Sequence, residues 1–389
     1  MTSTTSPSAT GLQWAQRLVR LNTVSRESNL ALIETIADEL RTLGVPLRIT
    51  RDETGAKANL FATLGEGKPG GVILSGHSDT VPWDGQDWSV DPLGAELSNG
   101  RLYGRGSADM KAFIGLVVAR TKAFLEADPP HALHYAFTHD EETGCAGARE
   151  LIADLKDAGI APRLCVVGEP TGMVPAVAHK GVYRWRCCVK GRAAHSSLTP
   201  RAVNAIEAAA RVVNHIADLA QGWRDHEARY EGFDVPFSTA TVGVITGGIA
   251  DNVIPEDCRF HYEIRDLPSS DVRAMQRAVL DGAAALEPAM KAIDPAAGFR
   301  FEEICAVPSF LAPPGDPAVA LARRLAGTDA TTLVAFGTEA GLFQRAGIAT
   351  AVCGPGFIAQ AHQADEFVSL DQLAACEAFL ARLAQPLSR

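Results

Sequence analysis

Histidine and carboxylate side chains recur in this sequence directly after short runs of apolar residues. His77 and Asp79 follow the apolar residues 72–74, and residues two apart on an extended chain point to the same side. Imidazole is a favoured zinc ligand, and a carboxylate usually holds the second ring nitrogen of a ligating histidine, a role that suits Asp79. The alternatives are a capping aspartate beside a satisfied histidine, or a nucleophilic Ser78, although Thr80 stands where a nucleophile elbow needs glycine.

A run of ionisable residues, HDEE, follows the apolar residues 132–137. Such a run is usually a solvated surface. Adjacent carboxylates on an extended chain, however, point in different directions, so one can bind a metal while the other reaches the water bound to it. This division of labour suits Glu142 as a metal ligand and Glu141 as a general base.

Three more ionisable residues occupy comparable places. Asp109 lies in GRGSADMK at a junction between a strand and a helix, where it could instead cap the helix. The glycines of this segment do not have the spacing of a phosphate-binding loop. Glu169 follows the apolar residues 164–167, and His362 follows residues 349–356. None of the three is specific by itself.

As a set, these residues are much more specific. In an open parallel sheet the carboxyl ends of the strands share one edge, where function concentrates. We therefore expect five side chains to meet at that edge: His77, Asp109, Glu142, Glu169 and His362. Two imidazoles and three carboxylates form a mixed nitrogen and oxygen set that suits two divalent metal ions.

The hydrophobic pattern predicts the elements that must position this set. Apolar residues at helical spacing open the chain near residues 11–22 and 28–43, and short buried runs then alternate with helical patterns. This alternation is typical of an α/β fold with a mostly parallel sheet flanked by helices.

The pattern changes near residue 180. Apolar and charged residues alternate over residues 183–190 and again over residues 258–265, with helical patterns between and after them. Strands with one wet face favour a small antiparallel α+β module. We therefore predict one domain made of residues 1–179 and 293–389, with a second domain, residues 180–292, inserted into it.

Composition bounds the function. The net charge of -10 argues against nucleic acid as a partner, because binding to phosphates needs clustered Lys and Arg. No apolar run approaches the roughly 18 residues of a membrane span, and residues 1–10 resemble a frayed tail rather than a targeting segment. The eight cysteines are scattered, without a C-x-x-C pair, which indicates a reducing cytoplasm. A small polar substrate is the partner that fits.

The segments SGHSDTVP, GRGSADMK, HDEETG, VGEPT and AHQ resemble the zinc-dependent aminoacylase and carboxypeptidase superfamily, and the likeness covers nearly the whole chain. The resemblance implies that Asp109 bridges two zinc ions, for which cobalt is a plausible substitute. It implies that His77 and Glu169 complete one metal site and that Glu142 and His362 complete the other.

The resemblance also implies the catalytic roles and the assembly. Glu141 would be the general base, and His195, in GRAAHSS, would reach the substrate carbonyl from the inserted lid or dimerisation domain. In the superfamily this histidine often comes from the second subunit of a homodimer. Read without the resemblance, His195 is a loop histidine with a local hydrogen bond.

Segments such as GGIADNVIP, YEIRDLP and FGTEAG resemble members of the superfamily that remove an acyl group from small amino acids. This likeness suggests that Arg265 and Asn252 hold the substrate carboxylate, since arginine presents a planar fork to carboxylates. The alternative for Arg265 is an ion pair with Glu263 or Asp266.

Glu339 lies in a loop flanked by glycines, and charge complementarity suggests that it reads a cationic substrate side chain. The alternative is a glutamate at the start of a helix. Other acyl groups or dipeptides remain as substrates, because the metal ligands say nothing of the side chain accepted. A non-catalytic metal or amino-acid binding protein is a further reading, against which the intact Glu141 argues.

Overall fold

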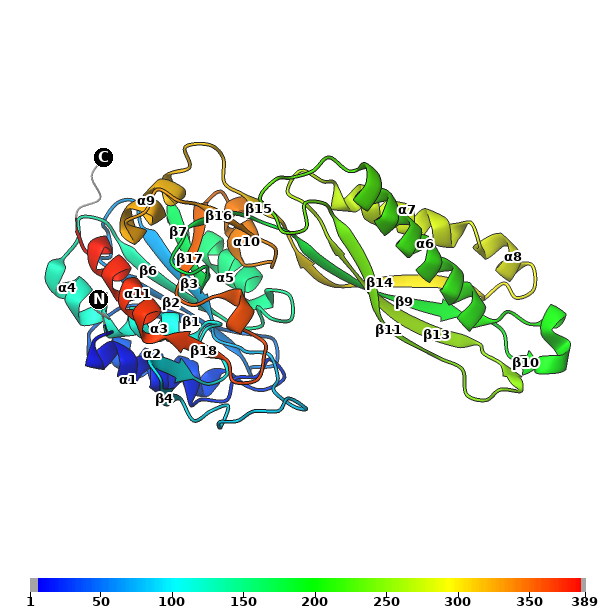
Figure 1. Ribbon diagram of the computed structural model, residues 1–389, viewed down its shortest axis with the longest axis horizontal. Helices are drawn as coiled ribbons and strands as arrows, with labels where there is room; N and C mark the ends of the chain where they lie inside the picture. Colours follow the sequence, from blue (N-terminus) through cyan, green and yellow to red (C-terminus); the bar gives the residue numbers. More distant parts are fainter. Residues whose placement is uncertain (1–5, 386–389) are drawn as a thin grey trace. The chain divides into compact units, whose positions relative to one another are not determined.

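The structure is a computed structural model that describes residues 6–385, and this part of the chain forms two compact units (Figure 1). The first unit comprises the chain up to Ala178, Phe310–Val334 and the chain from Thr338 onward. The second comprises His179–Ser309 and Ala335–Gly337. The first is the α/β unit and the second is the inserted α+β unit.

The α/β unit is a sheet with helices on both faces. Its helices are α1 (Ala9–Val19), α2 (Leu30–Thr42), α3 (Lys111–Ala119), α4 (Thr121–Ala127), α5 (Ala146–Asp157), α9 (Pro317–Ala326), α10 (Ala340–Arg345) and α11 (Leu370–Leu383), with the short 3-10 turn η2 (Ile358–Gln360). Its sheet strands are β1 (Leu47–Arg51), β2 (Ala58–Leu64), β3 (Val72–His77), β6 (Leu133–Thr138), β7 (Leu164–Pro170), β8 (Ala176–His179), β15 (Phe310–Leu311), β16 (Thr332–Val334) and β17 (Ala349–Gly354).

The strand order is β1-β2-β6-β3-β7-β17-β8-β15, with β16 paired to β8. The central strands β6, β3, β7 and β17 run parallel to one another. Antiparallel pairs occur toward the edges, between β1 and β2, β2 and β6, and β17 and β8. The predicted mostly parallel α/β sheet is confirmed, and its central strands end at one edge.

Two hydrophobic clusters lie on opposite faces of this sheet. Leu74 of β3 packs into one cluster, with α1, α2, α3, α9 and α11, whereas its neighbour Ile73 packs into the other, with α5 and α10. Adjacent residues of a strand point to opposite faces, so the apolar run of β3 is buried on both sides. This burial explains why the strand reads as a continuous hydrophobic run.

A small sheet lies beside the main one. The strands β4 (Glu96–Ser98) and β5 (Arg101–Tyr103) form a hairpin around Asn99 and Gly100, both at positive φ, as Asn-Gly turns require. Strand β18 (Phe367–Ser369) pairs antiparallel with β5. This pairing brings the segment before β18 alongside the segment after β5.

The inserted unit is an antiparallel sheet covered by helices on one face. Its sheet has the order β11-β13-β9-β14, and its core joins the inward residues of β9 and β13 to α6 and α7. The elements are β9 (Val182–Lys190), β10 (Ala194–His195), η1 (Ser196–Arg201), α6 (Ala205–His226), β11 (Thr239–Gly247), β12 (Val253–Ile254), β13 (Asp257–Arg265), α7 (Val272–Ala284), α8 (Glu287–Lys291) and β14 (Gly298–Val307).

The inserted unit extends to Ser309, beyond the end at residue 292 that the sequence predicted. The reason is β14, which pairs antiparallel with β9 along nearly its whole length. A register irregularity between Glu303 and Cys305 disturbs the apolar and polar alternation of this strand, which hid it from pattern analysis.

Near the amino terminus, residues 8–10 cap and begin a helix rather than belonging to the tail expected over residues 1–10. Helix α1 begins at Ala9, and the Ser8 hydroxyl caps it by accepting a hydrogen bond from the Gly11 amide at 3.0 Å. Residues 1–5 lie outside the described part. Within residues 6–385, no helix is long and apolar enough to cross a membrane.

Candidate metal centre

The central strands of the α/β unit deliver ionisable residues to one edge of the sheet. His77 is the last residue of β3, Glu142 follows the end of β6, Glu169 lies near the end of β7, and His362 follows β17. Because these strands are parallel neighbours, the side chains meet at their carboxyl ends.

Asp109 lies between the two imidazoles. Its Oδ1 is 2.9 Å from Nε2 of His77, and its Oδ2 is 3.3 Å from Nε2 of His362. It comes from the loop that leads into α3, where the Asp109–Met110 peptide bond is cis. One carboxylate therefore faces both histidines.

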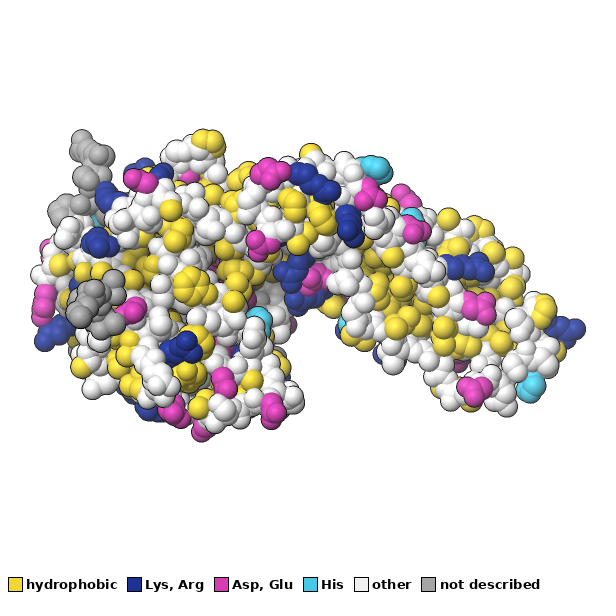
Figure 2. Space-filling view, in the orientation of Figure 1, with side chains coloured by type: hydrophobic (Ala, Val, Ile, Leu, Met, Phe, Trp, Pro, Cys, Tyr) yellow, Lys and Arg dark blue, Asp and Glu magenta, His cyan; other side chains and the backbone are white. Residues whose placement is uncertain are grey.

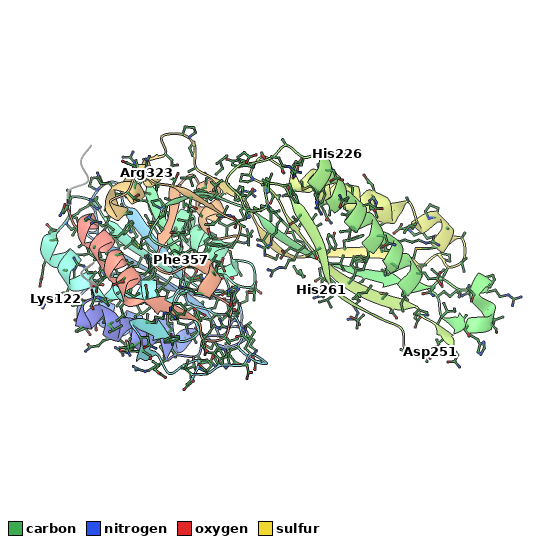
Figure 3. All side chains as sticks on the ribbon, viewed as in Figure 1. Lys122, His226, Asp251, His261, Arg323 and Phe357 are labelled. Atoms are coloured by element: carbon green, nitrogen blue, oxygen red, sulfur yellow. The ribbon has the colours of Figure 1, made fainter. Side chains whose placement is uncertain are left out.

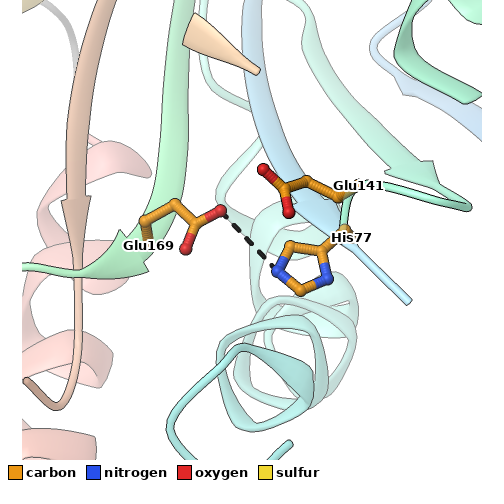
Figure 4. Close-up of side chains that lie close together, drawn as sticks. All are labelled: His77, Glu141 and Glu169. Atoms are coloured by element: carbon orange, nitrogen blue, oxygen red, sulfur yellow. Dashed lines mark ion pairs between the residues drawn. The ribbon is translucent and has the colours of Figure 1, made fainter. Parts of the chain in front are cut away.

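Two further carboxylates complete the grouping. Glu169 Oε1 is 3.7 Å from His77 Nε2, and Glu142 Oε1 is 3.0 Å from His362 Nε2. Figure 4 shows the carboxylates of Glu169 and Glu141 beside the ring of His77. The structure thus brings together all five residues expected as metal ligands.

Asp79 fixes the orientation of His77. The backbone carbonyl of Asp79 is 3.0 Å from His77 Nδ1, and because a carbonyl only accepts, Nδ1 carries the proton. Nε2 is then left to face Asp109, with its lone pair available for a metal. The Asp79 carboxylate is 3.6 Å from Nδ1.

The Asp79 carboxylate also holds the loop after β6, which sequence reasoning missed. It accepts hydrogen bonds from the backbone amides of Glu141 at 3.0 Å and Glu142 at 3.3 Å, and from the Ser25 hydroxyl at 2.7 Å. Asp79 therefore positions both the histidine ligand and the two adjacent glutamates.

The cluster carries an excess of negative charge that cations would balance. Burial raises the pKa of Glu169 well above its ordinary value, and the charge of Asp109 adds to the shift. Burial likewise raises the pKa of Glu141, with a contribution from Glu142. Four crowded carboxylates outnumber two imidazoles, so divalent cations would supply the missing positive charge.

The donor atoms lie close enough for metal binding. Among the described residues, ligand atoms of His77, Glu141 and Glu169 lie within 4.8 Å of one another, and so do those of His77, Asp109 and Glu142. Nitrogen and oxygen ligands of this kind suit zinc and similar ions. The residues present therefore fit a metal centre.

Residues 73–385 match the profile of peptidase family M20/M25/M40. The chain belongs to this family. Family M20/M25/M40 consists of metal-dependent hydrolases, so the metal centre is that of a hydrolase, and the resemblance seen in the sequence is confirmed.

Curated relatives cover most of the chain. The acetylornithine deacetylase of Proteus mirabilis strain HI4320 is 37% identical over 351 residues, which cover 88% of this chain and 86% of the relative. The acetylornithine deacetylase of Photorhabdus laumondii is 36% identical over 345 residues, covering 88% and 87%.

Solved structures of the family share the fold. The M20 family metallo-carboxypeptidase Sso-CP2 from Sulfolobus solfataricus has a TM-score of 0.77 at 16% identity, covering 97% of this chain and 99% of that one. A tripeptidase from Staphylococcus aureus has a TM-score of 0.74 at 20% identity, covering 96% of each chain. At such identities the likeness concerns the fold alone.

The structure corrects the expectation for Glu339 in this M20 family member. The residue is 1% exposed, and its carboxylate accepts hydrogen bonds from the hydroxyls of Ser75 at 2.9 Å and Thr138. Both hydroxyls belong to central strands, β3 and β6, so Glu339 links the start of α10 to these two strands. A buried carboxylate with both oxygens engaged is not placed to read a substrate side chain.

Arg265 forms the ion pair that was its alternative reading. Its Nε donates to Glu263 at 2.6 Å, and one terminal nitrogen donates to the carbonyl of Ala335 at 3.4 Å. About one third of its side chain is exposed.

His195 and Asn252 lie together at one end of the inserted unit. His195 pairs with Val253 between β10 and β12, and the Ser196 amide donates to the Asn252 carbonyl at 3.0 Å. Figure 3 labels Asp251 at this end and His261 farther along the sheet. The His195 ring is exposed, with Nδ1 2.9 Å from the Ser197 hydroxyl.

Arg265 and Asn252 are not brought together within one chain. Strand β13 runs from Asp257 to Arg265, which is eight residue steps or about 26 Å at ~3.3 Å per residue, and Asn252 precedes its first residue. The two residues therefore cannot hold the same carboxylate from a single copy of the chain. The sequence did contain a sign of this, because the alternation over residues 258–265 predicted an extended strand between the two residues, and the shared-carboxylate prediction did not take its length into account.

Proposed function

We propose that this protein is a zinc-dependent amidohydrolase that removes the acetyl group from N-acetyl-L-ornithine, yielding acetate and L-ornithine for arginine biosynthesis. The observation that carries the proposal is Asp109 facing both His77 and His362, with Glu141 beside them. Curated relatives named acetylornithine deacetylase, at 34–37% identity, support the choice of substrate.

In this proposal the ligands divide around Asp109. His77 and Glu169 would hold one zinc ion, Glu142 and His362 the other, and Asp109 would touch both; cobalt would serve as a substitute. When bound, the ions polarise the amide carbonyl and lower the pKa of water, as zinc does in other hydrolases. Glu141 takes the proton of the attacking water and passes it to the departing amine of ornithine.

The carbonyl oxygen gains negative charge during the attack, and His195 is our candidate donor to it. We propose that His195 and Asn252 come from a second copy of the chain and that Arg265 holds the carboxylate. The separation of Asn252 from Arg265 along β13 supports this arrangement. The eight free cysteines support a cytoplasmic protein.

Strand β11 supports a homodimer. It is an edge strand of the inserted sheet, and edge strands offer unpaired backbone groups for pairing with another chain. Val244 and Ile245 on β11 and Ile249 after it are exposed, the last by 88%. Figure 2 shows hydrophobic side chains on the visible face of the inserted unit.

Complementation tests the dimer. His195→Ala and Glu141→Gln variants, each nearly inactive, are co-refolded or co-expressed in equal amounts. If His195 acts across the interface, half of the dimers are heterodimers with one intact site, so activity returns to roughly a quarter of the wild-type value. If His195 acts within its own subunit, neither site of a heterodimer is intact, because one subunit lacks His195 and the other lacks Glu141. The mixture then stays inactive.

A substrate panel tests the reaction. Zinc-loaded and cobalt-loaded protein is assayed with acetylornithine, acetylcitrulline, acetylmethionine, succinyl-diaminopimelate and a dipeptide. We expect kcat/KM for acetylornithine to exceed the others by at least about 10-fold, because buried polar groups left unpaired by the wrong substrate cost affinity. A faster reaction with another acylated amino acid or with the dipeptide would change the substrate, and no turnover of any would favour a binding protein.

A further inference from the structure

A polar cluster with two buried charged members lies beside the proposed metal centre and has no part in the mechanism above. It consists of Arg105, Gln86 and Glu366, and we call it the Arg105 network. Arg105 and Glu366 are each 1% exposed, and Arg105 also stacks over the ring of Trp88, 5.2 Å from its centroid. Burying charged groups costs free energy unless they are paired, so the burial of Arg105 and Glu366 is expected to serve a structural or functional role.

Glu366 holds the backbone of the proposed bridging ligand. Its Oε1 accepts hydrogen bonds from the amides of Ala108 at 2.9 Å and Asp109 at 3.1 Å. Its Oε2 accepts one from Arg105 at 2.7 Å. The carboxylate therefore fixes the main chain from which the Asp109 side chain reaches both histidines.

Gln86 holds the backbone of His362. Its Oε1 accepts from Arg105 at 2.5 Å and from the Trp88 indole at 3.1 Å, and its Nε2 donates to the His362 carbonyl at 2.8 Å. Arginine and indole only donate and a carbonyl only accepts, so the amide has one orientation. His362 has φ of 61°, a region that residues other than glycine seldom adopt, so its backbone needs an external contact to hold it.

Arg105 joins the two arms. One terminal nitrogen of its guanidinium contacts Glu366 and the other contacts Gln86, and the planar group keeps these contacts at a fixed spacing. The chain of contacts runs from the Asp109 amide to the His362 carbonyl without a break.

We propose that the Arg105 network is a positioning device that sets the spacing between Asp109 and His362. It thereby sets the affinity for the metal ion that Glu142 and His362 would hold. The proposal rests on the ligand assignment made above. None of its members is a proposed metal ligand or substrate contact; they act through the main chain of two proposed ligands.

The test uses variants of Gln86, which is only partly buried. Gln86→Ala removes the acceptor for Arg105 and Trp88 as well as the donor to the His362 carbonyl. Gln86→Glu keeps the acceptor for Arg105 and Trp88 but cannot donate to the His362 carbonyl. Ser89→Ala is the matched control, because the Ser89 hydroxyl bonds Asp365 at 2.7 Å in the same loop pair without touching the network.

Zinc affinity is measured on the full-length protein by competition with a chelator, and zinc content by mass spectrometry after dialysis. We expect both Gln86 variants to bind the more weakly held ion about 10–100-fold less tightly, the usual effect of losing a contact that orients a ligand. Their content should fall from two ions toward one, and excess zinc should restore kcat. Ser89→Ala should match wild type in both measurements.

Two results would overturn the proposal: wild-type zinc affinity in Gln86→Ala, or an affinity loss in Gln86→Ala that Gln86→Glu fully restores. The melting temperature of each variant identifies any general loss of folding, in which case Gln86→Glu alone decides. A failure of the proposed function looks different: the substrate panel would then fail on wild-type protein, whereas the zinc affinities of the Gln86 variants would still differ from that of wild type. A failure of the ligand assignment would appear as wild-type protein that does not bind two ions.

Discussion

Replacing Glu141 by glutamine is expected to lower kcat by about 10²–10⁴-fold, the usual contribution of a general acid-base group, while the metal content stays unchanged. The Glu141 amide is held by Asp79 at 3.0 Å, so the backbone position does not depend on the side chain. Glutamine preserves the size of the side chain but cannot take a proton from water. Steady-state kinetics and metal analysis on the same sample measure the two effects separately.

Metal analysis matters because Glu141 donor atoms lie near those of His77 and Glu169. A loss of one ion in Glu141→Gln would make Glu141 a ligand rather than a base, and near-normal turnover would remove it from the mechanism. Glu150→Gln is a matched control. Glu150 lies on the neighbouring helix α5, and its carboxylate is 3.1 Å from His139 Nε2. Replacing it should leave kcat within about twofold, as surface substitutions usually do.

Much of the site was predictable because ionisable residues at the carboxyl ends of parallel strands lie at one edge of the sheet. His77, Glu142 and Glu169 each follow or end a strand buried on both faces, and such strands read as apolar runs that point to their own ends. Parallel pairing then forces these ends together. The sequence could therefore predict that these three residues lie close together without knowing the order of the strands.

Contacts that depend on three-dimensional neighbours were not predictable. Glu366 looks like a surface residue in the sequence, yet the pairing of β18 with β5 buries it against Arg105. Glu339 looks like a loop residue, but two hydroxyls on different strands enclose its carboxylate. In both cases the partner lies more than 200 positions away, beyond the reach of any local pattern.

The ends of the inserted unit show the same limit. Strands β9 and β13 alternate cleanly and were predicted, whereas the residues of the irregular β14 were assigned with residues 293–389 to the α/β domain instead of the inserted one. The separation of Arg265 from Asn252, by contrast, follows from the length of β13, which the alternation had predicted. A strand of that length already places the residues at its two ends too far apart to share a ligand.

The largest effect on metal binding is expected from Asp109→Asn. Asp109 is the residue that faces both His77 and His362, so its charge serves both proposed ions. Asparagine keeps the shape and one acceptor oxygen, but it loses the charge and cannot bridge two cations. We expect the zinc content to fall from two ions to below one, and kcat/KM to fall by ~10³-fold or more, since a metal contributes several kcal/mol to the transition state.

The zinc content of His362→Ala, compared with that of Asp109→Asn, tests whether Asp109 serves both metal sites and His362 only one. His362 contacts Glu142 and Asp109 but not Glu169, so its loss should leave one ion bound, whereas Asp109→Asn should weaken both. Asp84→Asn, which alters an exposed partner of Arg26, should keep two ions and controls for the change of charge. If Asp109→Asn retained two ions, the two proposed sites would share no ligand, and the ions would have to be held by separate residue sets. The crowding of Glu141, Glu142 and Glu169 around one aspartate would then need another explanation.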